Sequence, residues 1–125
     1  MAYAYNRKEA KDHGEGGKLV GASMEGKRVL IVDDVITAGT AIRESHSMLL
    51  EVGAKPVGVV IALDRAEIRS SEDPVSAVQA VARDLALPVV SIVNLPQLQT
   101  FLEKSPAYSD ETLQSVKQYR KEFGV

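Results

Sequence analysis

Two adjacent carboxylates, Asp33 and Asp34, follow the apolar run V-L-I-V, and the loop after them contains Thr37, Gly39 and Thr40. Ionised carboxylates only accept hydrogen bonds, whereas hydroxyl and backbone N–H groups donate them. Backbone N–H groups at the beginning of a helix also suit phosphate. This order of groups predicts a ligand that carries hydroxyl groups at one end and phosphate at the other.

A ribose 5-phosphate has this polarity, because its vicinal diol can donate to the two aspartates while its phosphate lies in the threonine–glycine loop. A bare phosphate beside two carboxylates would be repelled. The apolar run predicts a buried strand and a helical pattern begins at Ala41. The loop therefore lies where ligands bind in open α/β sheets, at the carboxyl end of a strand. The alternative is a strand end with a solvated acidic turn and an ordinary threonine N-cap.

Residues 29–40, V-L-I-V-D-D-V-I-T-A-G-T, resemble the phosphoribosyl-diphosphate (PRPP) binding motif of the type I phosphoribosyltransferase family. The resemblance implies an α/β fold with a parallel, Rossmann-like sheet. It also implies that PRPP contacts the end of the strand, the loop and the first helical residues. The expected PRPP contacts in this motif are Asp33, Asp34, Val35, Ile36, Thr37, Ala38, Gly39, Thr40 and Ala41.

Residues 7–17, R-K-E-A-K-D-H-G-E-G-G, predict a mobile loop, because they show no useful periodicity and carry three glycines near their end. Acidic residues interleave with the basic ones, so a solvated charged loop is the alternative to an anion site. Neither a dinucleotide fingerprint nor a Walker A loop is present. The segment is very similar to the catalytic loop of the orotate phosphoribosyltransferase family. That resemblance implies that the diphosphate is held by Arg7, Lys8, Lys11 and His13.

The same resemblance implies that this loop closes over the active site of a neighbouring subunit, so a homodimer with the loop acting in trans is expected. Lys11 and His13 would neutralise the departing diphosphate, and Asp33 and Asp34 would hold the ribose; these four are the expected catalytic residues. Mg²⁺ is the expected cofactor. It would be held mainly by substrate phosphates and water, as its reluctance to lose water favours.

A second apolar strand is expected at residues 56–63, and it ends in Asp64 and Arg65. Taken alone, these residues favour a local ion pair of Arg65 with Asp64 or Glu67. The segment I-A-L-D-R-A-E, however, resembles the family's segment in which an arginine holds orotate, and a guanidinium can bind a carboxylate with two hydrogen bonds. The expected orotate contacts are Thr37 and Arg65.

Alternating strands and helices predict a single phosphoribosyltransferase domain over residues 1–125 with a parallel sheet. Strands are expected at residues 2–6, 28–32, 56–63 and 88–93. Helices are expected at residues 41–52, from an N-cap at Asp73 through Leu85, after an N-cap at Asn94, and from Ser109 to Gly124. All four strands are expected to join one sheet, with one face or edge left bare.

Composition excludes several other classes of protein. The chain of 125 residues is 45% hydrophobic and 26% charged, which is typical of one globular domain, and its net charge of −2 gives no bulk attraction to nucleic acid or an anionic membrane. Without cysteine it has no disulfide or thiol chemistry. No signal peptide or apolar run of membrane-spanning length is visible, so a cytoplasmic protein is expected.

The predicted reaction is transfer of ribose 5-phosphate from PRPP to orotate, which gives orotidine 5′-phosphate and diphosphate in de novo UMP synthesis. The alternative is a PRPP-binding regulatory module or an inactive fragment. Lys11 and His13 argue against a pure binder, which needs no groups to stabilise a leaving diphosphate. Members of the family also carry a sizeable segment before the position of Ala2. We therefore expect the chain to be the C-terminal portion of the enzyme, with little activity alone.

Overall fold

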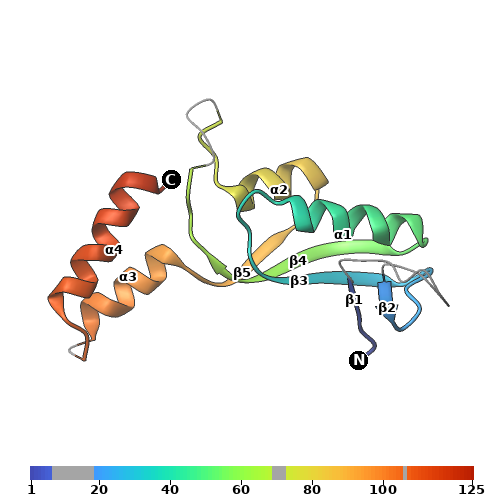
Figure 1. Cartoon of the computed structure of the whole chain (residues 1–125), viewed down its shortest axis with the longest axis horizontal. Coiled ribbons are helices and arrows are strands. Elements are labelled where there is room, and N and C mark those ends of the chain that lie inside the picture. The colour runs from blue at the N-terminus through green and yellow to red at the C-terminus, as the bar shows by residue number, and fades with distance from the viewer. Residues whose placement is uncertain (7–18, 69–72, 106) are drawn as a thin grey trace.

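A parallel sheet positions the candidate site, with strands β3 (Arg28–Val35), β4 (Lys55–Asp64) and β5 (Val89–Asn94) in the order β3-β4-β5. The structure is a computed structural model that describes residues 1–6, 19–68, 73–105 and 107–125 (Figure 1). Each strand runs somewhat past its predicted C-terminal end. The predicted parallel α/β core is confirmed.

The loop predicted at residues 7–17 lies outside the described residues. The same is true of the four residues expected to hold diphosphate, Arg7, Lys8, Lys11 and His13.

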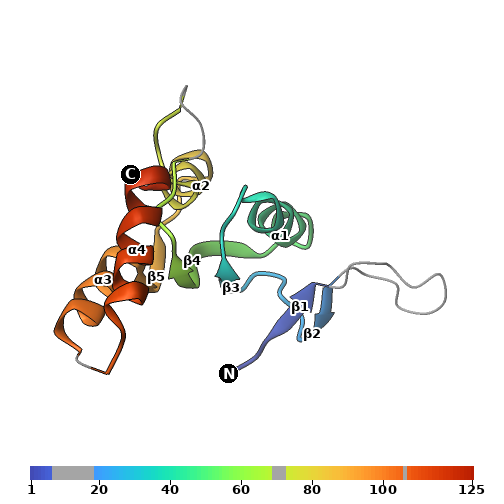
Figure 2. The same cartoon turned by 60° about the vertical axis from the view of Figure 1, so that its left-hand side comes forward.

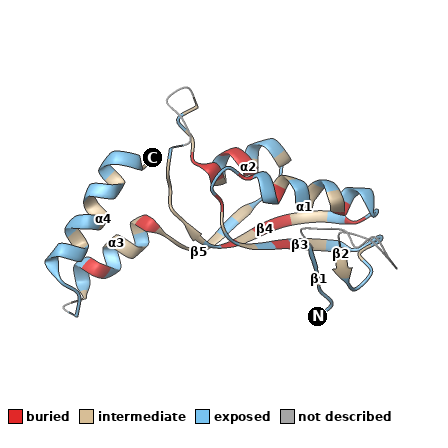
Figure 3. Cartoon of the chain, viewed as in Figure 1, coloured by how far each residue is buried: buried red, intermediate tan, exposed pale blue. Residues whose placement is uncertain are grey.

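Two helices, α1 (Thr40–Glu51) and α2 (Ala77–Leu85), lie on one face of the sheet (Figures 1 and 2). Side chains alternate along a strand, so every second strand residue points at these helices. The apolar stripe of each helix meets those residues and forms the core (Figure 3). Its larger buried members are Ile31, Ile36, Ile42, Leu49, Val59, Ile61 and Val81.

The opposite face of the sheet carries exposed apolar side chains from both outer strands. Leu30 and Val32 on β3 are 52% and 72% exposed, and Val90 and Ile92 on β5 are 59% and 78% exposed. The register places Val32 beside Val60 and Val60 beside Val90, so these side chains form one continuous apolar surface. The prediction of a bare sheet face is confirmed for the described residues.

The N-terminal strand does not join the core sheet among the described residues, so that prediction is wrong. Strand β1 (Ala4–Asn6) pairs antiparallel with β2 (Leu19–Gly21) in a separate two-stranded sheet. The predicted strand at residues 2–6 is also too long. The physical reason is that β2 and the following residue, whose N–H donates to the Tyr3 carbonyl, already satisfy the backbone groups of this short segment.

Helix α2 begins at Ala77 with Ser76 as its N-cap, so the predicted N-cap at Asp73 is wrong. The Ser76 hydroxyl accepts from the Gln79 N–H at 3.1 Å, and the Gln79 side chain accepts from the Ser76 N–H at 2.8 Å. This reciprocal capping box satisfies two N-terminal donors. The carboxylate of Asp73 instead pairs with Arg83 at 3.0 Å.

Two further helices, α3 (Leu95–Lys104) and α4 (Asp110–Phe123), lie side by side on the β5 side of the sheet (Figure 2). Their predicted N-caps, Asn94 and Ser109, are confirmed, since each side chain accepts a backbone N–H of the first turn. After α4 the chain returns to the segment that follows β4. Within the described residues, no helix combines the length and apolarity that a bilayer span requires.

Candidate functional site

Asp33 and Asp34 lie within β3, near its C-terminal end, rather than in a loop after it. The strand continues through Val35 because β4 supplies ladder partners: Asp33 lies opposite Ile61, and Val35 lies opposite Leu63. The predicted strand end at residue 32 is therefore too early. Successive strand residues point to opposite faces, so Asp33 is half-buried on the side of the helices while Asp34 is exposed.

Each aspartate uses one carboxylate oxygen locally. Asp33 accepts a hydrogen bond from the Asp34 N–H at 2.9 Å, and Asp34 accepts one from the Val35 N–H at 2.7 Å. The second oxygen of each carboxylate makes no hydrogen bond to another described residue. Two acceptor oxygens at the carboxyl end of a strand thus remain available to a ligand with donor groups.

The loop after β3 leads directly into helix α1, whose N-terminus has no side-chain cap. Ile36 is buried in the core, Thr37 and Ala38 are exposed, and Gly39 is the N-cap of α1 with φ 80°. No side chain of a described residue accepts the first N–H groups of this helix. These residues therefore do not form the threonine N-cap that the sequence left open as an alternative. Uncapped N–H groups at a helix N-terminus suit an anion.

Gly39 is required here because the loop lies against α2. A Cβ atom at this position would lie 2.5 Å from Cγ2 of Val81 and 2.6 Å from Nη1 of Arg43. Its left-handed φ is also one that glycine adopts far more readily than other residues. The loop is therefore held close to the second helix, and its path cannot be kept with a larger residue.

Arg43, on the first turn of α1, fixes the loop from the other side. Its Nη1 donates to the Ala38 carbonyl at 2.8 Å, and its Nη2 pairs with Oδ2 of Asp84 on α2 at 2.7 Å. The hydrogen bonds from Arg43 and then Arg83 hold the pKa of the Asp84 carboxyl below its usual range. Arg43 was not among the predicted site residues, although its position four residues after Gly39 was an available signal.

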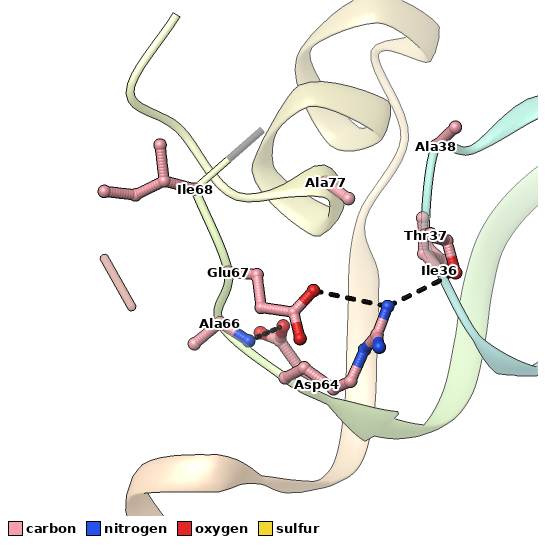
Figure 4. Close-up of a pocket in the computed structure, with 9 residues that line it drawn as sticks. Ile36, Thr37, Ala38, Asp64, Ala66, Glu67, Ile68 and Ala77 are labelled. Atoms are coloured by element: carbon pink, nitrogen blue, oxygen red, sulfur yellow. Dashed lines mark hydrogen bonds and ion pairs between the residues drawn. The ribbon is translucent and has the colours of Figure 1, made fainter. Parts of the chain in front are cut away.

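A pocket of about 320 Å³ opens between the loop after β3 and the segment after β4 (Figure 4). Thr37 and Glu67 face each other across it (Figure 4). The pocket is lined by Ile36, Thr37, Ala38, Asp64, Arg65, Ala66, Glu67, Ile68 and Ala77. The two residues expected to contact orotate, Thr37 and Arg65, are therefore brought together although 28 positions separate them.

The Arg65 guanidinium spans this pocket. Its Nη2 lies 3.3 Å from Oγ1 of Thr37 and 3.3 Å from Oε2 of Glu67, as the dashed lines in Figure 4 mark. Its Nε is buried and has no hydrogen-bond partner among the described residues. Of the two ion pairs that the sequence favoured, the one with Glu67 forms, whereas Asp64 accepts the Ala66 N–H at 2.8 Å. An arginine that lines a pocket can bind a carboxylate there.

Glu67 is itself held by Tyr119 of α4, whose hydroxyl donates to Oε1 of Glu67. That hydrogen bond, together with burial and the negative charge of Glu67, raises the pKa of the Tyr119 hydroxyl above its ordinary value. The phenol therefore stays protonated, and remains a donor, throughout the neutral range. Tyr119 was not among the predicted site residues, because no local pattern connects two residues 52 positions apart.

The described residues could supply only a few of the ligands of an Mg²⁺ ion. Within residues 1–6, 19–68, 73–105 and 107–125, no three His, Cys, Asp or Glu side chains gather as a metal cage. Asp33 and Asp34 retain one available carboxylate oxygen each. An Mg²⁺ ion here would take most of its ligands from water and from the phosphates of a substrate, which is its usual preference.

Comparison with known proteins points to one family. A model of the phosphoribosyl transferase domain matches residues 1–92. Curated relatives from Stenotrophomonas maltophilia and Escherichia coli, both named orotate phosphoribosyltransferase, are 52% and 54% identical over 125 residues. These matches cover 100% of this chain and 57% of each relative, so the chain spans little more than half the length of those proteins.

Solved structures agree with this comparison. A crystal structure of orotate phosphoribosyltransferase from Francisella tularensis superposes with a TM-score of 0.78 at 35% identity, over 100% of this chain and 57% of that one. The orotate phosphoribosyltransferase of Mycobacterium tuberculosis in complex with PRPP gives a TM-score of 0.61 at 26% identity. That match covers 78% of this chain and 50% of the other.

Proposed function

The chain belongs to the phosphoribosyl transferase domain family, and from this premise we propose that it transfers the ribose 5-phosphate group of PRPP to orotate. The products are orotidine 5′-phosphate and diphosphate, in the synthesis of UMP. Relatives that are 52–54% identical over this whole chain carry the name of that enzyme. Because the chain spans 57% of their length, we propose the activity for a protein of the relatives' full extent.

The observation that carries the proposal is the meeting of three features at one edge of the sheet. Available acceptor oxygens lie at the end of β3, an uncapped helix N-terminus follows within six residues, and an arginine pocket adjoins the loop between them. A phosphorylated sugar with a diol fits the first two features. A planar carboxylated base fits the third.

In the proposed complex, Asp33 and Asp34 accept hydrogen bonds from the ribose diol. The 5-phosphate lies in the loop that leads into α1 and takes N–H and hydroxyl donors from it. The residues assigned to PRPP here are Asp33, Asp34, Val35, Ile36, Thr37, Ala38, Gly39, Thr40 and Ala41. Arg43 and Asp84 support the proposal, since they fix the Ala38 carbonyl of this loop.

Orotate occupies the adjoining pocket with its carboxylate on Arg65 and with Thr37 beside it. The pocket volume of about 320 Å³ supports a small planar ligand. The Arg65 guanidinium supports a hydrogen bond to such a ligand, because Arg65 lines the pocket with its side chain 33% exposed. This arrangement orients the base toward the sugar, because Thr37 belongs both to the pocket and to the phosphate loop.

The chemical step separates diphosphate from the anomeric carbon, which gains positive charge as the bond lengthens. Such a step requires positioning and charge stabilisation more than a protein nucleophile. Diphosphate is neutralised by Arg7, Lys8, Lys11 and His13, an assignment that rests on the sequence of residues 7–17. Mg²⁺ supplies further positive charge at the phosphates when it is bound.

Assembly and location complete the proposal. We assign a homodimer in which residues 7–17 of one subunit serve the site of the other, and a cytoplasmic location. The sequence of residues 7–17 supports the homodimer.

The test follows the loss of orotate absorbance with PRPP and Mg²⁺, using the protein extended to the full length of its relatives. Adenine, hypoxanthine and uracil serve as control bases. We expect orotate alone to be consumed, and only with both PRPP and Mg²⁺. Turnover of a control base in place of orotate would refute the assignment.

A further inference from the structure

The C-terminal end of the chain is hydrogen-bonded to the segment after β4, which lines the arginine pocket. The Ile68 N–H donates to the Phe123 carbonyl at 2.8 Å, and the Val125 N–H donates to the Ala66 carbonyl at 2.9 Å. These two bonds flank an antiparallel bridge between Glu67 and Gly124. The segment after β4 is therefore held from one side by residues that lie beyond the 1–92 matched by the family model.

Side chains continue this connection into the pocket. The Tyr119 hydroxyl binds one carboxylate oxygen of Glu67, and the other oxygen of Glu67 lies 3.3 Å from Nη2 of Arg65. Glu67 thus uses its two oxygens on two different partners. Its side chain is 25% exposed and that of Arg65 is 33% exposed, so both partly face the open pocket.

We infer that Glu67 and Tyr119 are positioning residues that set the direction of the Arg65 guanidinium for a carboxylate-bearing base, so that helix α4 takes part in substrate selection. The inference rests on the proposed function of the pocket. Tyr119 does not line the pocket, whereas Glu67 does. Both act through Arg65.

The physical reason lies in the freedom of an arginine side chain. Arginine has many rotamers, and a two-bond contact with a carboxylate requires its planar group to point in one direction. Thr37 alone provides one long contact at 3.3 Å and leaves rotation about the Cδ–Nε bond possible. Glu67 supplies a second, charged contact, and Tyr119 keeps Glu67 itself from turning away toward water.

The decisive variant is Tyr119→Phe, which removes one hydroxyl and keeps the ring. The ring contact with Phe123, at 5.0 Å between centroids, is retained, so α4 should remain folded. The matched control is Tyr108→Phe, which removes the same atom from a tyrosine that packs on Phe101 at the far end of the helix pair. Thermal unfolding of both variants checks that each is folded.

Kinetics of the protein extended to the full length of its relatives give the first readout. For Tyr119→Phe we expect the KM for orotate to rise by about 3- to 10-fold, the effect of one net hydrogen bond, with the KM for PRPP changed by less than about twofold. Glu67→Ala should raise the KM for orotate further, and Tyr108→Phe should match the wild type. An equal rise in both KM values, or no rise, would overturn the inference.

The second readout needs no turnover and separates failure of this inference from failure of the proposed function. The side-chain Nε–H signal of Arg65 in nitrogen-edited NMR, identified by its loss in Arg65→Lys, should broaden or shift in Tyr119→Phe but not in Tyr108→Phe. An unchanged signal overturns the inference whatever the enzyme does. If the signal changes in Tyr119→Phe but the wild-type protein does not consume orotate, the proposed function is overturned, and with it the role in substrate selection.

Discussion

Replacing Gly39 by alanine tests whether the loop between β3 and α1 is held in place by helix α2. Two independent costs arise at this position. The backbone is left-handed, with φ 80°, and the added Cβ would lie 2.5 Å from Cγ2 of Val81 and 2.6 Å from Nη1 of Arg43. The arginine can move, because its side chain is flexible, but Val81 is fully buried and belongs to a helix.

The magnitude follows from these two costs. A left-handed alanine costs about 1–2 kcal/mol relative to glycine. Overpacking against a buried side chain adds about 1–3 kcal/mol. A loss of about 2–5 kcal/mol is a large part of the roughly 5–15 kcal/mol by which a domain is usually stable. Gly26 offers a matched control, since its φ is 68° and nothing lies within 4 Å of a Cβ built there.

Urea unfolding of the two variants beside the wild type measures the difference. We expect Gly26→Ala to lose only the backbone cost, about 1–2 kcal/mol, and Gly39→Ala to lose clearly more. PRPP affinity, measured by calorimetry, should fall only for Gly39→Ala, because only that loop contacts the proposed ligand. Equal losses of stability in the two variants would show that the loop does not lie against Val81, and the reasoning would be wrong.

Three further expectations address other parts of the molecule. Asp33→Asn combined with Asp34→Asn should weaken PRPP binding by about 1.5–3 kcal/mol for each charge-assisted bond that is lost. The far-UV circular dichroism should be unchanged. Unaltered affinity in calorimetry would mean that the acids do not bind the ribose. Arg43→Gln should lower the affinity for ribose 5-phosphate about 3- to 10-fold and barely move the urea midpoint, since partly exposed ion pairs add little stability; a large stability loss with normal affinity would contradict its role at the loop. Ile92→Thr should reduce self-association of the 125-residue chain in sedimentation if the bare sheet face is the contact surface, and undiminished association would place that contact elsewhere.

The strand, loop and helix that carry the phosphate side could be predicted because their signals are local. The apolar run before Asp33, the glycine at position 39 and the periodicity after it are all read within one stretch of chain. Even there, the strand end was misplaced, because pairing of Asp33 and Val35 with β4 extends β3. The sequence of one strand does not reveal how far the neighbouring strand pairs with it.

The other differences between prediction and structure also arise because a residue or strand bonds to a partner that its local sequence does not indicate. Asp73 followed by proline is a reasonable helix start, but Ser76 with Gln79 forms a complete capping box three residues later. The short N-terminal strand pairs with β2 rather than the core sheet. The link from Tyr119 to Glu67 joins residues 52 positions apart and leaves no periodic signal.

The two sides of the site are stabilised in different ways, and this difference bears on how such a site can change. Ile36 and Ile42 place the phosphate loop in the same core as Ile61, so moving that loop disturbs the packed centre of the domain. In the arginine pocket, Glu67 is instead bound by Tyr119 of α4, a helix with no fully buried residue among those described. If this contact directs Arg65 as we infer, substitutions on α4 can redirect Arg65 at little cost to the core. A shared phosphate side and an adjustable base side would let one fold accept one sugar donor and different bases.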